Sequence, residues 1–163
     1  MRSLGNRRPR FAADGMLGSL AKWLRITGYD ASYARDEKDD DILMKARAEG
    51  RVLLTRDKLL AQKAGDDGVF VDSEVIDEQI RQVFGLFHLH FDEKGTRCAL
   101  CNGDLVVVPK EEVSPLVPPR SLAMTDDFLR CSGCGKIYWK GTHWKNILEK
   151  LKRLGIDQDR SFE

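Results

Sequence analysis

The sequence predicts an α/β fold in which a parallel sheet is flanked by helices and is followed by a small unit held together by cysteines. Strand-like and helix-like segments alternate from residue 10 to about residue 90, as they do in parallel sheets with right-handed crossovers. Two Cys-x-x-Cys pairs follow, in residues 98–101 and 131–134. The 163 residues suffice for one ordinary domain and a small second one. We therefore expect a first domain over residues 10–92 and a second over residues 93–156.

Composition and charge describe a soluble globular chain. Apolar residues make up 42% and charged residues 33% of it, and no apolar run approaches the length that spans a bilayer. The basic start, residues 1–10, is not followed by an apolar segment long enough for a signal peptide, so we expect a cytoplasmic protein. The 27 basic residues are nearly cancelled by 26 acidic ones, so the net charge of +1 does not by itself favour a nucleic acid as partner.

The first predicted elements are a strand over residues 11–13 and a helix that follows it. The helix is indicated by apolar residues at positions i, i+3, i+4 and i+7, namely Leu17, Leu20, Ala21 and Leu24. Asp14 stands at the carboxyl end of the strand, where open α/β sheets usually bind ligands. A helix N-cap requires the same residue type at the same place, so both interpretations of Asp14 stay open.

Two further strand and helix units continue the pattern. A strand over residues 31–34 leads to an acidic cluster, residues 36–41, which opens the second helix. Acids in a first turn are favoured by the helix dipole, so part of this cluster requires no function. The compact apolar run 51–55 is typical of a buried parallel strand, and it places Asp57 just before a helix over residues 58–64.

The last strand and helix of the first domain are expected over residues 68–71 and 73–87, and the pattern changes after them. The second domain should contain a strand over residues 105–108, a proline-bearing loop over 109–120, a strand over 135–139 and a basic amphipathic helix over 144–154.

The paired Cys-x-x-Cys turns are the most specific local signal in the chain. Four thiolates, two from each turn, can form the closed tetrahedral site of a structural zinc, with the ligands Cys98, Cys101, Cys131 and Cys134. Two disulfides would be unusual in a cytoplasmic protein, and neither turn opens the thioredoxin-like helix that a redox site requires. We therefore expect a zinc ion that shapes the fold and leaves no open position for a substrate.

Acidic residues are the catalytic candidates. Asp14 and Asp57 both follow strands of the predicted sheet, and the cluster Asp39 to Asp41 opens the helix that leads into the Asp57 strand. If these residues converge, their oxygens would bind Mg²⁺ or Mn²⁺. Such ions position and deprotonate water and neutralise the charge that builds on a phosphodiester. Spacing alone equally allows three unrelated helix caps.

Basic and aromatic residues lie near both candidate sites in sequence. The candidate phosphate contacts are Lys22, Arg25, Arg56 and Lys58 near the acids, and Lys136, Lys140 and His143 near the second cysteine pair. The aromatic residues Tyr138, Trp139 and Trp144 are interleaved with the second group, a mixture that suits single-stranded nucleic acid. Each aromatic residue on its own is better explained as part of the core.

Five stretches together carry a family resemblance: FAADGMLG over residues 11–18, WLRITGYD over 23–30, LLTRD over 53–57, RCALCN over 97–102 and CSGCGKIYWKGTH over 131–143. With them the sequence resembles the Mut-seven C-terminal ribonuclease family from about residue 10 to 150. The resemblance implies a PIN-like, three-layer α/β/α nuclease domain over 10–92 and a zinc ribbon with a C-terminal helix over 93–156. It also implies metal-dependent cleavage of RNA.

The resemblance also assigns the acidic set. It maps directly onto Asp14 and Asp57. The middle acid maps best onto Asp39, because the family pattern of an apolar residue three positions later and a small residue seven positions later is met by Ile42 and Ala46. The alternatives are Asp40 or Asp36 for the middle acid, and the candidate for a fourth acid is Asp72.

We therefore predict a metal-dependent endoribonuclease in which Asp14, Asp39 and Asp57 hold Mg²⁺ or Mn²⁺, water attacks the phosphodiester and the zinc ribbon helps to hold RNA. The predicted RNA contacts are Lys22, Arg25, Arg56, Lys136, Lys140 and His143. The alternative is a non-catalytic RNA-binding adaptor that uses the zinc ribbon, and a third option, by analogy alone, is a toxin-like translation inhibitor. The ribosome or an RNA-processing protein is a candidate partner, no membrane is expected, and the oligomeric state is open.

Overall fold

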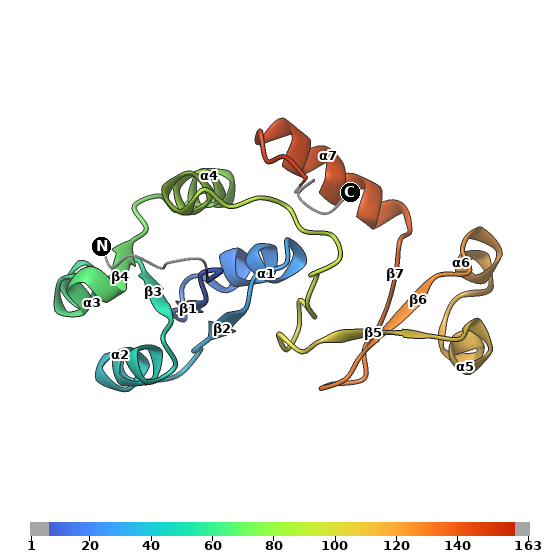
Figure 1. Cartoon of the computed structure of the whole chain (residues 1–163), viewed down its shortest axis with the longest axis horizontal. Coiled ribbons are helices and arrows are strands. Elements are labelled where there is room, and N and C mark those ends of the chain that lie inside the picture. The colour runs from blue at the N-terminus through green and yellow to red at the C-terminus, as the bar shows by residue number, and fades with distance from the viewer. Residues whose placement is uncertain (1–6, 159–163) are drawn as a thin grey trace.

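The computed structural model describes residues 7–158, which form two units and a C-terminal helix that packs back onto the first unit (Figure 1). Residues 1–6, part of the basic start in which we expected no signal peptide, lie outside the described residues. No helix within the described residues is long and apolar enough to cross a membrane.

The secondary structure of the first unit follows the expected order of elements, whereas the second unit contains elements that were not predicted. The strands of the first unit are β1 (Phe11–Ala13), β2 (Ala31–Tyr33), β3 (Val52–Thr55) and β4 (Gly68–Phe70). Its helices are α1 (Gly18–Ile26), α2 (Asp39–Ala48), α3 (Lys58–Ala64), the 3₁₀ turn η1 (Gly65–Asp67) and α4 (Ile76–Phe87). The second unit contains β5 (Leu105–Val108), α5 (Lys110–Val113), the 3₁₀ turn η2 (Ser114–Leu116), α6 (Pro119–Met124), β6 (Phe128–Cys131) and β7 (Ile137–Trp139). The final helix is α7 (Thr142–Arg153).

All four strands of the first sheet run parallel, in the order β2-β1-β3-β4. Phe11 of β1 lies in register with Ala31 of β2 and with Val52 of β3. The chain moves from β1 outward to β2 and then crosses to β3 on the other side of β1, so the strand order reverses between β1 and β3. Open parallel sheets bind ligands at the carboxyl ends of the strands beside such a reversal.

Helices cover both faces of this sheet, because successive strand residues point to opposite sides. On one face, Phe11 and Ala13 pack with buried residues of α1 and α4. On the other face, Ala12 and Leu53 pack with α2 and α3. The expected α/β class, with a parallel sheet between two helical layers, is confirmed.

The second sheet is antiparallel, in the order β5-β6-β7, and covers a small core of its own. Its middle strand, β6, was not predicted. The region that we expected to be a proline-bearing loop forms α5, η2 and the start of α6 instead. Pro119 is the first residue of α6, a position that tolerates proline because the first amides of a helix have no intrahelical partner. Val113 and Val117 are buried and anchor this region to the core beside Phe128.

Helix α7 leaves the second unit and lies against the first (Figure 1). Leu154, just beyond its end, joins the core on the α1 and α4 face of the parallel sheet. Lys150 Nζ lies 2.9 Å from Oδ1 of Asp77 in α4 and 4.9 Å from the centre of the Trp23 ring in α1. Helix α7, which we assigned to the second domain, therefore packs against residues of the first domain. The expected domain boundary at residue 92 stays a prediction.

Candidate active site and metal centre

Acidic residues follow three strands of the parallel sheet. Asp14 comes directly after β1, Asp57 comes two residues after β3, and Asp72 comes two residues after β4. Asp39 is the first residue of α2, which leads into β3. Because the strands are parallel, the first three leave the same edge, and β1 and β3 are the neighbours between which the strand order reverses. Asp14 and Asp57 thus flank the position where open sheets bind ligands.

The Asp14 carboxylate is buried and hydrogen-bonded, with 6% of the residue exposed. Its Oδ1 accepts the backbone N–H of Met16 at 3.0 Å. Its Oδ2 accepts the Thr55 hydroxyl at 2.5 Å and the backbone N–H of Arg56 at 3.1 Å. Helix α1 begins only at Gly18, and Asp14 makes no cap bond to it. Asp14 is therefore not a helix cap: its side chain ties the end of β1 to the end of β3.

Asp57, in contrast, is the N-cap of α3. Its Oδ1 accepts the backbone N–H groups of Leu59 at 2.8 Å and Leu60 at 3.1 Å. Its own backbone N–H donates to the Thr55 hydroxyl oxygen at 2.9 Å. The other carboxylate oxygen, Oδ2, accepts no hydrogen bond from any residue in 7–158. Capping and ligand binding are compatible at Asp57, because they would use different oxygens.

Asp39 shares a cavity with Asp57. This open cavity of about 430 Å³ is lined by both aspartates and by side chains of α3, among them Gln62 and Lys63. The alternative middle acid, Asp40, has a side chain that is 79% exposed and pairs with Lys63 at 3.2 Å. Of the two neighbouring acids, only Asp39 lines the cavity beside Asp57.

The three predicted catalytic acids lie at one edge of the sheet but do not form a single cluster of ligand oxygens. Asp14 is not among the residues that line the cavity of Asp39 and Asp57. Within the described part of the chain, the only group of three or more His, Cys, Asp or Glu side chains close enough to hold one metal ion consists of the cysteines. Asp14 and Asp57 are instead connected through hydrogen bonds to Thr55.

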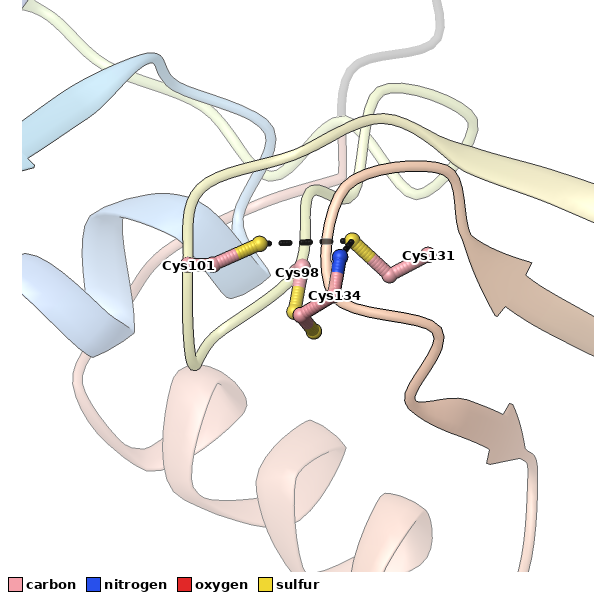
Figure 2. A group of neighbouring side chains, drawn as sticks. All are labelled: Cys98, Cys101, Cys131 and Cys134. Atoms are coloured by element: carbon pink, nitrogen blue, oxygen red, sulfur yellow. Dashed lines mark hydrogen bonds between the residues drawn. The ribbon is translucent and has the colours of Figure 1, made fainter.

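The four cysteines converge from two turns, and their Sγ atoms lie within 4.8 Å of one another (Figure 2). The Sγ atoms of Cys98 and Cys134 are 3.7 Å apart, and those of Cys101 and Cys131 are 3.3 Å apart. Zinc–sulfur bonds of about 2.3 Å in a tetrahedron place sulfurs roughly 3.8 Å apart, so this donor set fits zinc. A Cβ at Gly103 would lie 2.7 Å from the Cys131 sulfur, which favours glycine there. The cysteines could therefore bind a structural metal such as zinc, as predicted.

The cysteines also influence one another's protonation. Burial raises the pKa of Cys131, but the backbone N–H of Cys134, the Cys101 thiol and the backbone N–H of Gly133 outweigh burial and bring this pKa to about 6. The pKa of Cys101 rises to about 11, chiefly because its hydrogen bond to Cys131 favours the protonated thiol. A thiolate is thus present near neutral pH, and a metal ion would displace the remaining thiol protons.

Arg25 joins the first cysteine turn to the parallel sheet. It is 6% exposed. Its guanidinium donates to the backbone carbonyl of Ala31 at 2.8 Å and to that of Ala99 at 3.0 Å. Burial lowers the pKa of Arg25 from its ordinary value. The charged group of Arg25, for which we predicted an RNA contact, therefore faces the inside of the protein and contacts the first cysteine turn, and the RNA contact stays a prediction.

Asp30 completes the junction between the two units. Its Oδ1 accepts hydrogen bonds from Arg51 at 2.6 Å and from the Asn102 amide at 2.7 Å. Burial raises the pKa of Asp30, but the hydrogen bonds from Arg51 and Asn102 and the charge of Arg51 outweigh burial and lower the pKa to about 2. Asn102 follows the first cysteine pair, so this network fixes the cysteine turn against the start of β2.

The predicted RNA contacts near the acids differ in whether their charged groups already have partners within the protein. Lys22 is exposed on α1. The guanidinium of Arg56 already has partners: it donates to the Asp72 carbonyl at 3.1 Å and lies 3.6 Å from the Glu74 carboxylate. Lys58 is exposed, and its Nζ lies 5.6 Å from the centre of the Phe70 ring.

The predicted contacts on the second unit are all exposed. Lys136 lies over the Tyr138 ring, with its Nζ 5.2 Å from the ring centre. Lys140 forms an ion pair with Glu93. His143 meets Trp139 edge to face, with ring centres 6.5 Å apart.

Two residues with a place in these sites were missed by the sequence analysis. Thr55, fully buried, links Asp14 to Asp57, and its only signal is its position between an apolar strand and an acid. Asp30 was noted only as the last residue of the stretch 23–30, yet its carboxylate accepts hydrogen bonds from Arg51, Asn102 and Arg10.

The fold and the cysteine centre together define an α/β domain with a parallel sheet, joined to a unit with the features of a zinc ribbon. The family model described as the Mut7-C RNAse domain matches residues 9–151, nearly the whole chain. The chain therefore belongs to the Mut7-C RNase domain family, which confirms the resemblance seen in the sequence. A search of curated proteins and a search of solved structures found no match. Membership of this family suggests a nuclease-type function, with RNA as the substrate class.

Proposed function

We propose that the chain is a metal-dependent endoribonuclease whose active site lies at the carboxyl edge of the parallel sheet. One observation carries this proposal: Asp14 and Asp57 follow the two strands between which the strand order reverses, and Thr55 connects them. In a member of an RNase domain family, acids at that position support hydrolysis of a phosphodiester bond.

The proposed ligands of Mg²⁺ or Mn²⁺ are Asp14, Asp39 and Asp57. Carboxylate oxygens are the donors that these hard cations prefer. The unbonded Oδ2 of Asp57 and the position of Asp39 in the same cavity support this assignment. When bound, such an ion positions and deprotonates water and neutralises charge on the phosphodiester.

The remaining residues of the edge would hold the acids and the RNA. The Thr55 hydroxyl and the Arg56 backbone N–H fix the orientation of the Asp14 carboxylate. The exposed amines of Lys22 and Lys58 would pair with phosphates on either side of the cleaved bond. On the second unit, the exposed residues Lys136, Lys140 and His143 would add contacts to the same RNA.

The test is cleavage of a panel of labelled RNAs, single-stranded and structured, by zinc-loaded protein with Mg²⁺, with Mn²⁺ or with neither. Wild type should cut only with the added ion. Asp14→Asn should abolish cutting while circular dichroism shows an unchanged fold. Asp127→Asn is the matched control, because it removes an exposed carboxylate from the second unit and should cut as wild type does. Leaving out the ion is preferable to a chelator, which would also remove structural zinc.

One observation favours the RNA-binding adaptor as a second candidate. Asp14 already accepts three hydrogen bonds and does not share the cavity of Asp39 and Asp57. An adaptor would bind the RNA panel without turnover under every ion condition. Cutting by Asp14→Asn at the wild-type rate would reject the proposed site even if the protein is a nuclease.

A further inference from the structure

A second candidate binding site lies on the other unit, between α6 and the start of α7. A cavity of about 400 Å³ is lined there by residues that include Arg120, Trp139, Lys140 and His143. Its volume falls within the range of about 300 to 1,000 Å³ that is usual for small-ligand pockets. Figure 1 shows α6 and the start of α7 on the side of the second sheet, away from β3 and β4.

The charged side chains that line this cavity, Arg120 and Lys140, are both basic. Among the described residues that line it, none is acidic. By comparison, acids line both the cavity of Asp39 and Asp57 and a cavity of about 440 Å³ that contains Asp30 and Asp104. Arg120 is exposed and makes no hydrogen bond or ion pair within residues 7–158. Its guanidinium is therefore available to an anionic group, for which it offers paired donors.

Trp139 gives the cavity an aromatic wall. It is the last residue of β7, and its ring packs against Phe128 with ring centres 6.2 Å apart. His143 meets the same ring edge to face. A Cβ at Gly141 would lie 3.2 Å from Nε1 of Trp139, so glycine at this position leaves the edge of the indole uncovered. Aromatic surface beside the unpaired guanidinium of Arg120 suits a nucleotide, whose base stacks and whose phosphate is anionic.

We propose that this cavity binds one nucleotide unit of single-stranded RNA, with the base against Trp139 and His143 and the phosphate at Arg120. The choice of RNA as the ligand rests on the proposed function. Paired bases in a duplex are stacked within the helix and are not available to such a wall. The cavity would thus hold a single-stranded segment at a distance from the acids and select RNAs in which such a segment flanks the cut.

Binding is measured apart from cleavage, in full-length zinc-loaded protein carrying Asp14→Asn, without added Mg²⁺ or Mn²⁺. The probe is a fluorescein-labelled oligouridylate of about 12 nucleotides, followed by fluorescence anisotropy. Arg120→Glu and His143→Ala should each weaken binding by about tenfold. Lys152→Glu is the matched control: it makes the same kind of charge change at an exposed position at the other end of α7 and should weaken binding by less than about threefold.

Two results would overturn the proposal. Equal weakening by Arg120→Glu and Lys152→Glu would mean that RNA senses only the overall charge. Photo-crosslinking of the same protein to an oligonucleotide containing iodouridine should label the peptide that spans residues 137–144. Labelling confined to other peptides would place the RNA elsewhere.

Failure of this site and failure of the nuclease are distinguishable. If no protein cuts RNA but Arg120→Glu loses binding, the nuclease proposal fails and the nucleotide site stands. If wild type cuts RNA and Arg120→Glu, in the otherwise wild-type chain, binds and cuts single-stranded RNA as wild type does, the nucleotide site fails and the nuclease stands.

Discussion

Thr55 donates its hydroxyl hydrogen to Oδ2 of Asp14 over 2.5 Å, at the carboxyl edge of the parallel sheet. Thr55 is fully buried, and its oxygen also accepts the backbone N–H of Asp57. One side chain therefore holds both candidate metal ligands. This arrangement makes Thr55 a positioning residue of the proposed active site.

Thr55→Val should reduce RNA cleavage by about 10- to 100-fold, the usual effect of losing a partner that orients a metal ligand. It keeps the side-chain shape but removes both hydrogen bonds. The free energy of unfolding, measured in urea, should fall by about 1 to 3 kcal/mol, because the Asp57 N–H loses its partner. Thr55→Ser keeps the hydroxyl and should restore most of the cleavage. Full activity in the valine variant would show that Thr55 does not position Asp14.

Substitutions of Asp57 should separate its two roles. Asp57→Asn retains an oxygen for the cap of α3, so stability should change by less than about 0.5 kcal/mol while cleavage is lost. Asp57→Ala removes the cap as well and should cost about 1 kcal/mol more. Urea unfolding and cleavage rates on the same samples test this. If Asp57→Asn cuts RNA as wild type does and only the destabilised Asp57→Ala loses cleavage, Asp57 acts as a helix cap and not as a metal ligand.

Protein purified without a chelator should contain about one zinc ion per chain, measured by atomic emission. Cys101→Ser removes one of the four ligands and should lower the zinc content sharply and unfold the second unit. The loss should be visible in the near-ultraviolet circular dichroism of Tyr138, whose hydroxyl oxygen lies 3.0 Å from the Cys98 sulfur. A full complement of zinc and an unchanged spectrum in Cys101→Ser would exclude this cysteine as a ligand.

Acid should weaken the junction at Asp30. Its pKa is lowered to about 2 in the folded protein, against an ordinary value of 3.8. The stability contributed by the ionised group is therefore fully present above about pH 4 and is lost as the pH falls towards 2. The difference of nearly two units corresponds to about 2 kcal/mol. Asp30→Asn should destabilise the protein by roughly 3 kcal/mol at pH 7, since Arg51 is left buried with a weaker partner.

The same deficit should shrink as the pH falls to 2, because wild type then loses its own charge at Asp30. Urea unfolding of both proteins across this pH range measures the difference. Asp104→Asn is the control. The side chain of Asp104 is 77% exposed and lies 3.4 Å from the Arg97 guanidinium, and an ion pair that is so exposed contributes little to stability. A deficit for Asp30→Asn that does not change with pH would contradict the ionic explanation.

Local periodicity was enough to predict most of the fold. The apolar spacing of Leu17, Leu20 and Leu24 predicted α1, and all three residues are buried. The first and last residues of the elements were predicted less accurately, because they depend on hydrogen bonds that the apolar pattern does not reveal. Helix α4 begins at Ile76, three residues after the expected start, since the Ser73 side chain bonds to the Val75 N–H and to Glu78 and forms a turn before the helix.

The candidate site was less predictable than the fold. Spacing placed Asp14 and Asp57 at strand ends, but it could not separate a cap from a ligand. The hydrogen bonds show only which of the two is a cap: Asp57 caps α3, whereas Asp14 accepts donors from β3 and its neighbours. The metal-ligand role of both residues stays a prediction. Nothing in the local sequence indicated that Arg25 would turn inward to a carbonyl group 74 residues away.

The sequence by itself determined the alternation of strands and helices, the pairing of the cysteine turns and the family, because each of these depends on residue types at short spacing. The tertiary contacts determined which charged groups are buried in the junction, where Thr55 places its hydroxyl, and that Leu154, just after α7, joins the core of the first unit. The physical reason is that the free energy of a buried charge or apolar face depends on its partner. Here those partners come from distant parts of the chain.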